Sequence, residues 1–361
     1  MSEATWRDLS YLESRDLAGA LYRELHGRSP NAARAHSIVA AFGQGRRYFE
    51  AAARADYLVQ PPLLLYGVIA LSRGLTLHLD STRGEEALSP AHGVHPSGWL
   101  ETLGPTTTAS AALKRLGDLK ATFARGTFTE LLAATRNVER APVIVQPFDE
   151  SLEATNVGTE DVRDVTVTLG DVLSRVPDLA ATYARTFVER GRCYPARVTY
   201  MKPAQETRID ILPTAFLGLP DERELREAFL LPPWISVEAA PLQSVLNPGQ
   251  VAISFTIPHP NEIDLEAIPW VVGTRDGRTF VLAQKPDDAR LSLLLTLYLV
   301  AFFTGTLARY HPSVWLTLQA PGAGDYFGPI LREAVATVQS RYPELIMREI
   351  RNTAPGSLIG H

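Results

Sequence analysis

Apolar positions in the first part of the chain repeat at helical spacing. One such stretch starts near Leu17, an alanine-rich one covers residues 32–57, and a third, residues 63–79, is apolar almost all round. Pro30 and Pro61 separate the stretches, because proline interrupts the interior of a helix. The pattern therefore predicts three helices, the third in the middle of a bundle.

Residues 80–108 differ, being dense in Gly, Pro, Ser, Thr and His. This composition predicts a long loop, and loops of this length usually carry function or move. The segment contains His92 and His95, the closest pair of histidines in the chain.

Short extended runs dominate residues 118–284 and predict strands. The predicted strands are residues 119–123, 143–145, 165–168, 197–200, 251–255 and 279–282. Asp276 and Gly277 predict a hairpin turn, since this pair readily adopts the backbone angles of a tight turn. Two helices are predicted within this region, at residues 170–190 and at residues 221–230 behind an Asp221 N-cap.

The pattern returns to helix after Pro286, with helices predicted at residues 287–310 and 326–341 and ended by Pro312 and Pro343. We therefore expect an α+β fold in which N- and C-terminal helices form one bundle around an inserted strand-rich middle region. The expected regions are 1–115, helical with the histidine-containing loop; 116–285, strand-rich; and 286–361, helical and packed on the first.

Composition limits the class of protein. The 361 residues carry a net charge of -5, so the whole chain lacks the excess positive charge that holds nucleic acid. Cys193 is the single cysteine and fits a reducing compartment, and no signal-peptide pattern opens the chain. We expect a cytoplasmic protein; the uncharged segment 291–308 is interpreted as a buried core helix, with a membrane helix as the alternative.

Five local sequences, taken in their order along the chain, resemble those of the bacterial YaaC-like family. They are residues 62–74, 92–94, 168–179, 309–315 and 341–346. Their order and co-occurrence carry the resemblance, which covers most of the chain. The resemblance narrows the fold and implies no reaction, no cofactor and no catalytic residue.

Strong catalytic motifs are missing: the sequence has no phosphate-binding loop, no Gly-x-Ser-x-Gly and no His-Glu-x-x-His. Arg73 and His78 match the arginine–histidine spacing of the HEPN class of helical ribonucleases. In that chemistry the arginine holds the scissile phosphate while the histidine transfers a proton. About two such matches are expected by chance in a chain of this composition, so the first interpretation is a pair at a helix end that bonds to backbone or solvent.

Four further residues are candidate ligand-binding groups. His92 and His95 could converge on one ligand, with Asp80, Glu85 or Glu86 nearby, although no third metal ligand is evident and no metal site is predicted. Arg309 and His311 follow the long apolar helix, where a cation either caps the helix C-terminus or binds an anion.

Two functions are compatible with these observations. The first is a regulatory or binding protein, with no cofactor, that recognises a protein or a small ligand. The alternative is a HEPN-like ribonuclease in stress or phage defence, which binds RNA and forms a homodimer, because that class builds its cleft across two subunits. An integral membrane protein is the least favoured reading.

Overall fold

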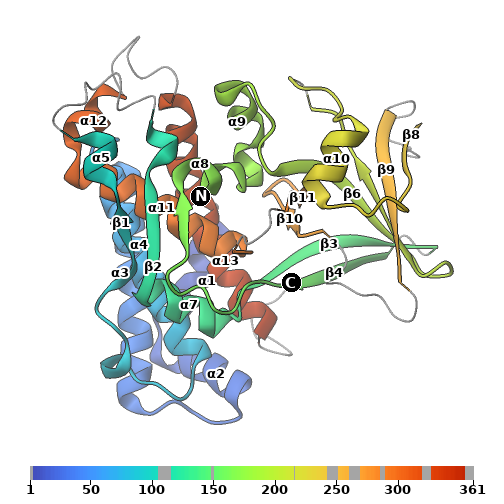
Figure 1. The fold of residues 1–361 in the computed structure, drawn as a ribbon. Helices are drawn as coiled ribbons and strands as arrows, with labels where there is room; N and C mark the ends of the chain where they lie inside the picture. The colour runs from blue at the N-terminus through green and yellow to red at the C-terminus, as the bar shows by residue number, and fades with distance from the viewer. Residues whose placement is uncertain are drawn as a thin grey trace. The chain divides into compact units, whose positions relative to one another are not determined.

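The computed structural model describes residues 3–104, 115–147, 150–214, 216–241, 251–259, 269–284, 289–318 and 327–353 (Figure 1). The chain folds into two compact units. The helical unit comprises Met1–Asn137, Thr159–Val172 and Leu294–His361, and the strand-rich unit comprises Val138–Gly158 and Leu173–Leu293.

The helical unit is built from helices of both chain ends and a small sheet. Its helices are α1 (Glu3–Tyr11), α2 (Arg15–His26), α3 (Ala32–Arg54), α4 (Gln60–Leu79), α5 (Trp99–Leu103), α7 (Thr127–Thr135), α8 (Leu169–Ser174), α11 (Leu293–Tyr310), α12 (Pro312–Thr317) and α13 (Gly328–Thr353), with short 3-10 turns η1 (Glu85–Ala87) and η2 (Leu116–Asp118). Helix α4 packs against α3 and α13, and α13 also contacts α1. The C-terminal helix thus belongs to the same bundle as the N-terminal ones.

Close approach of α4 and α11 depends on a small residue. A Cβ atom placed on Gly305 of α11 would lie 2.8 Å from Cβ of Leu65 and 3.1 Å from the carbonyl oxygen of Pro61, both on α4. Only glycine therefore allows this packing distance. In the same contact region the Arg309 guanidinium donates to the Tyr66 hydroxyl.

Both apolar helices are long enough to cross a membrane by composition, and both are largely enclosed by protein. In α11 the protein buries 89% of the most apolar window, and in α4 67%. Burial of this extent is what a core helix shows. The bundle also encloses Trp315 and Tyr342.

A three-stranded antiparallel sheet flanks the bundle in the order β1 (His92–Ser97), β2 (Lys120–Gly126), β5 (Thr166–Thr168). The register of β1 on β2 shifts between His92 and Val94. Gly93 lies at this irregularity with φ +79°, and a Cβ there would lie 2.8 Å from the backbone nitrogen of Phe128. Glycine is needed both for the backbone angle and for the close approach.

The strand-rich unit consists of an eight-stranded sheet and two short helices. Its elements are β3 (Val138–Gln146), β4 (Glu150–Val157), η3 (Pro177–Leu179), α9 (Ala180–Phe187), β6 (Cys193–Met201), β7 (Glu206–Ile211), α10 (Glu222–Phe229), β8 (Val237–Pro241), β9 (Val251–Pro258), β10 (Val271–Gly273) and β11 (Thr279–Leu282). The strands follow the order β10-β11-β6-β7-β9-β8, and β3 pairs with both β4 and β6. The pairing of β3 with β6 is parallel, and the other pairings are antiparallel.

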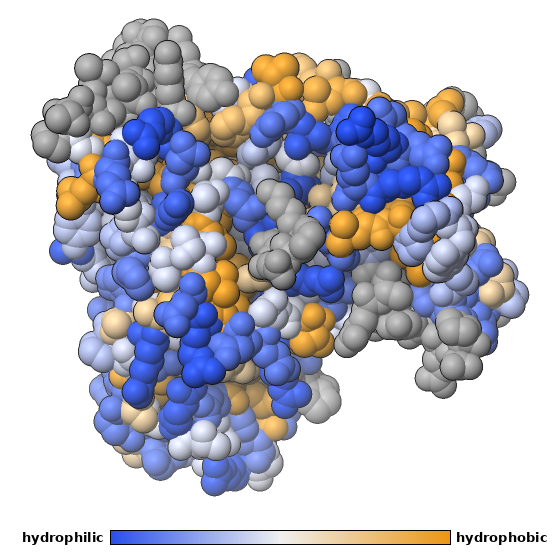
Figure 2. Space-filling view, viewed as in Figure 1, coloured by the Kyte–Doolittle hydropathy of each residue, from blue (hydrophilic) through white to orange (hydrophobic). Residues whose placement is uncertain are grey.

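Helix α10 covers one part of this sheet. Leu225 and Phe229 on its inner side join the buried cluster of the sheet residues. The outer side carries an ion pair between Arg223 and Glu227, and Figure 2 shows hydrophilic residues gathered over this helix. Asp221 accepts a hydrogen bond from the Glu224 backbone nitrogen at 2.7 Å, which confirms the predicted N-cap.

The predicted α+β class is confirmed, with helices at both ends and a strand-rich middle. The hairpin at residues 274–278 is also confirmed, because β10 and β11 pair across it. Helix α3 begins at Ala32 and α4 ends at Leu79, as the apolar pattern predicts.

Three predictions of local structure were wrong. The segment 80–104 is not a continuous loop, since it contains η1, β1 and α5; residues 105–108 lie outside the described ranges. The single helix predicted at 170–190 is divided into α8, η3 and α9, with Pro177 starting η3. Helix α13 does not end before Pro343 but continues through it to Thr353.

The continuation of α13 has a packing explanation. Tyr342, Leu345 and Ile346 are all buried, so the apolar face of the helix extends across the proline. Proline in a helix interior costs about 3 kcal/mol. Burying three large side chains at about 1.5–3 kcal/mol each outweighs that cost.

Candidate functional site

The predicted catalytic pair does not come together. The Arg73 guanidinium donates to the backbone oxygen of Ser89 at 2.8 Å. His78 instead faces helix α2, where its ring lies 6.1 Å from that of Tyr22 and its backbone oxygen contacts the His26 ring at 2.8 Å. Positions five apart on an α-helix are separated by about 140° around the axis, which explains the different surroundings.

His78 is enclosed by the bundle. Its side chain is 0% exposed, and neither ring nitrogen has a hydrogen-bond partner in the described part of the chain. Burial, together with the nearby His26, lowers the pKa of His78 to about 4. The ring is therefore neutral at physiological pH. A catalytic role for Arg73 and His78 stays a prediction.

The predicted ligand-binding histidines of β1 occupy different environments. His92 is half-buried, and its backbone oxygen accepts a hydrogen bond from the Tyr298 hydroxyl at 2.8 Å. Burial lowers the pKa of His92, and the positive charge of Arg309 lowers it further. His95 is exposed and pairs in register with Thr122 of β2. The two imidazoles thus do not share one set of neighbours.

Arg309 and His311 are neighbours in sequence but contact different groups. Arg309 is exposed, donates to the Tyr66 hydroxyl and lies 5.0 Å from the centre of the Tyr310 ring. The His311 ring lies 5.7 Å from that of Trp99, and burial lowers its pKa. Of the ligand-binding candidates, the structure therefore brings only His92 and Arg309 into one electrostatic environment. Ligand binding by any of the four stays a prediction.

Metal coordination finds no support within the described ranges, which contain no group of three or more His, Cys, Asp or Glu side chains able to hold an ion.

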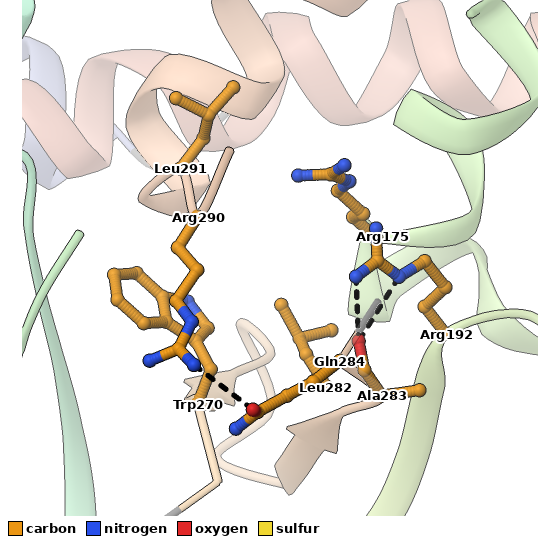
Figure 3. Close-up of a pocket in the computed structure, with 8 residues that line it drawn as sticks. All are labelled: Arg175, Arg192, Trp270, Leu282, Ala283, Gln284, Arg290 and Leu291. Carbon is orange, nitrogen blue, oxygen red and sulfur yellow. Dashed lines mark hydrogen bonds between the residues drawn. The ribbon is translucent and has the colours of Figure 1, made fainter. Parts of the chain in front are cut away.

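Sequence reasoning missed a pocket in the strand-rich unit that three arginines line. Its empty volume is about 350 Å³. The described lining residues are Arg175, Arg192, Trp270, Leu282, Ala283, Gln284, Arg290 and Leu291 (Figure 3). We call this site the arginine pocket.

Strand ends and adjoining turns position these side chains. Arg192 directly precedes β6, and Ala283 directly follows β11, its partner strand. Trp270 precedes β10, and its backbone oxygen accepts a hydrogen bond from the Leu282 nitrogen at 2.8 Å. Arg175 follows α8, where the backbone turns toward η3.

Backbone oxygens orient the two buried arginines. Arg175 and Arg192 are only 4% and 8% exposed. Nη1 of Arg175 donates to the oxygen of Ala289 at 2.6 Å. Arg192 donates twice to the oxygen of Ala283, through Nε at 3.1 Å and Nη2 at 2.7 Å. Two bonds that converge on one oxygen fix the plane of the guanidinium.

The other side of the pocket, in the view of Figure 3, holds Trp270 and Arg290. Arg290 is exposed and donates to the side-chain oxygen of Gln284 at 3.0 Å. Trp270 is 4% exposed, and its Nε1 has no hydrogen-bond partner among the residues that the structure describes. A buried indole N–H usually has a partner, which makes this donor unusual.

A signal for this pocket exists in the sequence but is weak. Arg175 interrupts the apolar run of residues 172–177, and charged residues are rarely buried without a partner. The arginines come from separate stretches of the chain, however, and only the fold brings them to one cavity.

Comparison with known protein families matches residues 10–350 to the family described as YaaC-like Protein. Neither the curated proteins nor the solved structures include a match. The match covers nearly the whole chain, and the resemblance seen in the five local sequences is thereby confirmed. The chain belongs to the YaaC-like family.

Proposed function

We propose that this protein is a cytoplasmic regulatory or binding protein that recognises a small ligand through the arginine pocket. One observation carries the proposal: two buried, backbone-oriented arginines, an exposed third one and an indole N–H with no partner among the described residues surround one cavity.

The size of the pocket favours a small molecule over a polypeptide. About 20 Å³ of the pocket is open to the centre of a water-sized group, which gives room for one compact group and not for a polypeptide segment. Leu282 and Leu291 give it apolar walls, while the polar groups are few and come from defined directions. This combination is typical of a site that binds and orients a ligand.

The lining favours binding over catalysis. None of the described lining residues is an Asp, Glu, His, Cys, Ser or Lys, so none of them supplies a nucleophile or a general base. Arginine stays protonated and contributes charge and hydrogen bonds only.

The test is a thermal-shift screen of the full-length protein against neutral, cationic and anionic small metabolites, followed by calorimetry for those that stabilise it. A true ligand raises the Tm as its concentration rises, because it binds the folded state alone. Trp270→Phe is expected to abolish or weaken this rise. The proposal fails if no compound stabilises the wild type, or if stabilisation is unchanged in Trp270→Phe.

A further inference from the structure

We infer that the arginine pocket binds a tetrahedral oxyanion, of the phosphate class, carried by its small ligand. The inference rests on the proposed function and adds the chemical class of the ligand. Charge, donor inventory and direction of approach support it in turn.

Charge comes first. Arg175, Arg192 and Arg290 bring three positive charges to the pocket, and no described lining residue is acidic. The carboxylate of Asp178 lies close enough to act, with Arg175 and Arg192, on the neighbouring Cys193. Among the described residues, this one carboxylate stands beside three guanidiniums, and positive charge around a partly desolvated cavity attracts an anion.

The polar side chains that line the pocket are mainly donors. Guanidinium and indole N–H groups donate hydrogen bonds and accept none. Nε1 of Trp270 is the clearest case, because it is buried and has no acceptor in the described ranges. A ligand group that only accepts hydrogen bonds, such as an oxyanion, relieves the cost of that buried donor.

The positions of the donors around the pocket distinguish a tetrahedral ligand group from a planar one. Arg175 and Arg192 lie on one side of the pocket in Figure 3, and Trp270 and Arg290 lie on the other. A planar carboxylate suits a single guanidinium fork in its own plane. A phosphate group has oxygens pointing in several directions and can accept from both sides at once.

The experiment measures binding of inorganic phosphate, sulfate and acetate to the full-length protein by calorimetry and tryptophan fluorescence, at constant ionic strength set with chloride. We expect saturable binding of phosphate and sulfate, about tenfold tighter than acetate, corresponding to one hydrogen bond to a charged group. The fluorescence change is expected to disappear in Trp270→Phe.

Matched arginine variants locate the binding. Arg290 is the exposed member of the pocket, so Arg290→Gln should fold, and it should weaken phosphate binding about tenfold. Arg278→Gln removes the same charge from an exposed hairpin of the same unit, where Arg278 pairs with Asp276 at 2.8 Å. We expect that control to bind phosphate as the wild type does.

Four results overturn the inference. Equal weakening by Arg278→Gln and Arg290→Gln indicates non-specific surface attraction, and tighter binding of acetate indicates a planar carboxylate. A third result is that no oxyanion binds saturably, although a neutral metabolite still binds in a Trp270-dependent manner. This result refutes the ligand class but leaves the proposed function intact. If neither anions nor metabolites bind, both fail.

Discussion

Three buried indole N–H groups differ between the two units in whether they have a hydrogen-bond partner. In the helical unit, Nε1 of Trp99 donates to the oxygen of Lys120 at 2.6 Å, and Nε1 of Trp315 donates to the oxygen of Tyr57 at 3.2 Å. In the strand-rich unit, Nε1 of Trp270 is equally buried and donates to no described group.

The arginines extend this comparison. Arg34 of the helical unit donates to the backbone oxygens of Leu77, Asp80 and Arg83, and so caps the end of α4. The arginines of the strand-rich pocket are also held by backbone oxygens, but they lie together around a cavity. A polar side chain that satisfies backbone hydrogen-bond acceptors has a structural role. A buried donor without an acceptor, beside a cavity and several like charges, indicates a binding site.

His78 is one of several buried polar side chains of the helical unit with an atom that lacks a hydrogen-bond partner among the described residues, and it gives the largest expected effect. The histidine pKa of 6.5 is lowered by burial to about 4 in the folded state, so the unfolded chain takes up a proton that the folded protein rejects. Above pH 6.5 the ring is neutral in both states, so its protonation does not change the stability. As the pH falls from 6.5 to 4, the protein should lose up to about 3 kcal/mol of folding free energy.

Urea denaturation between pH 7 and pH 4 measures this loss. His78→Phe keeps a ring beside Tyr22 and removes the titrating group, so its stability should depend less on pH by about 3 kcal/mol. His95→Gln removes an exposed histidine of the same unit and serves as the matched control. Identical curves for wild type and His78→Phe would mean that protonation of His78 is not opposed by folding.

Replacing Trp99 or Trp270 by phenylalanine is expected to give the second largest effect on stability. Trp99→Phe deletes a donor and leaves the oxygen of Lys120 without it, so it should lower the free energy of unfolding by about 3 kcal/mol. Trp270→Phe deletes a donor that bonds to no described group. It should cost only about 1 kcal/mol for the lost ring volume.

Denaturation in anion-free buffer compares these two variants directly. The expected difference of about 2 kcal/mol reflects mainly the lost hydrogen bond, because the change of ring is the same. Equal losses in both variants would contradict the distinction between a structural and an open indole N–H.

The sequence predicted best what depends on local pattern. Helical periodicity located α3 and α4, and the Asp-Gly pair located the hairpin between β10 and β11. Strand β1 was missed because Gly93 and Pro96 have low strand propensity, and its pairing with β2 comes from tertiary contacts. The continuation of α13 through Pro343 likewise depends on packing that no local signal records.

The candidate site was harder to predict than the fold. All six candidate site residues named from the sequence lie in the helical unit, because the residue spacings and the helix ends that suggested them occur in that unit. The arginine pocket has no motif, since Arg175, Arg192 and Arg290 are far apart in sequence and each is unremarkable in its own segment. The convergence of like charges on one cavity is a property of the fold alone.

The smallest expected effect tests whether polar groups of the strand-rich unit away from the pocket behave as those of the helical unit do. Asp221 caps α10 by accepting a hydrogen bond from the Glu224 nitrogen, so Asp221→Ala should cost about 1 kcal/mol in urea denaturation. Glu222→Gln, which removes an exposed partner of Arg226 from the same helix, should cost about 0.3 kcal/mol. If Asp221→Ala proves as neutral as this control, partnered polar groups contribute little in this unit, and the unpartnered Trp270 loses its value as a marker of a binding site.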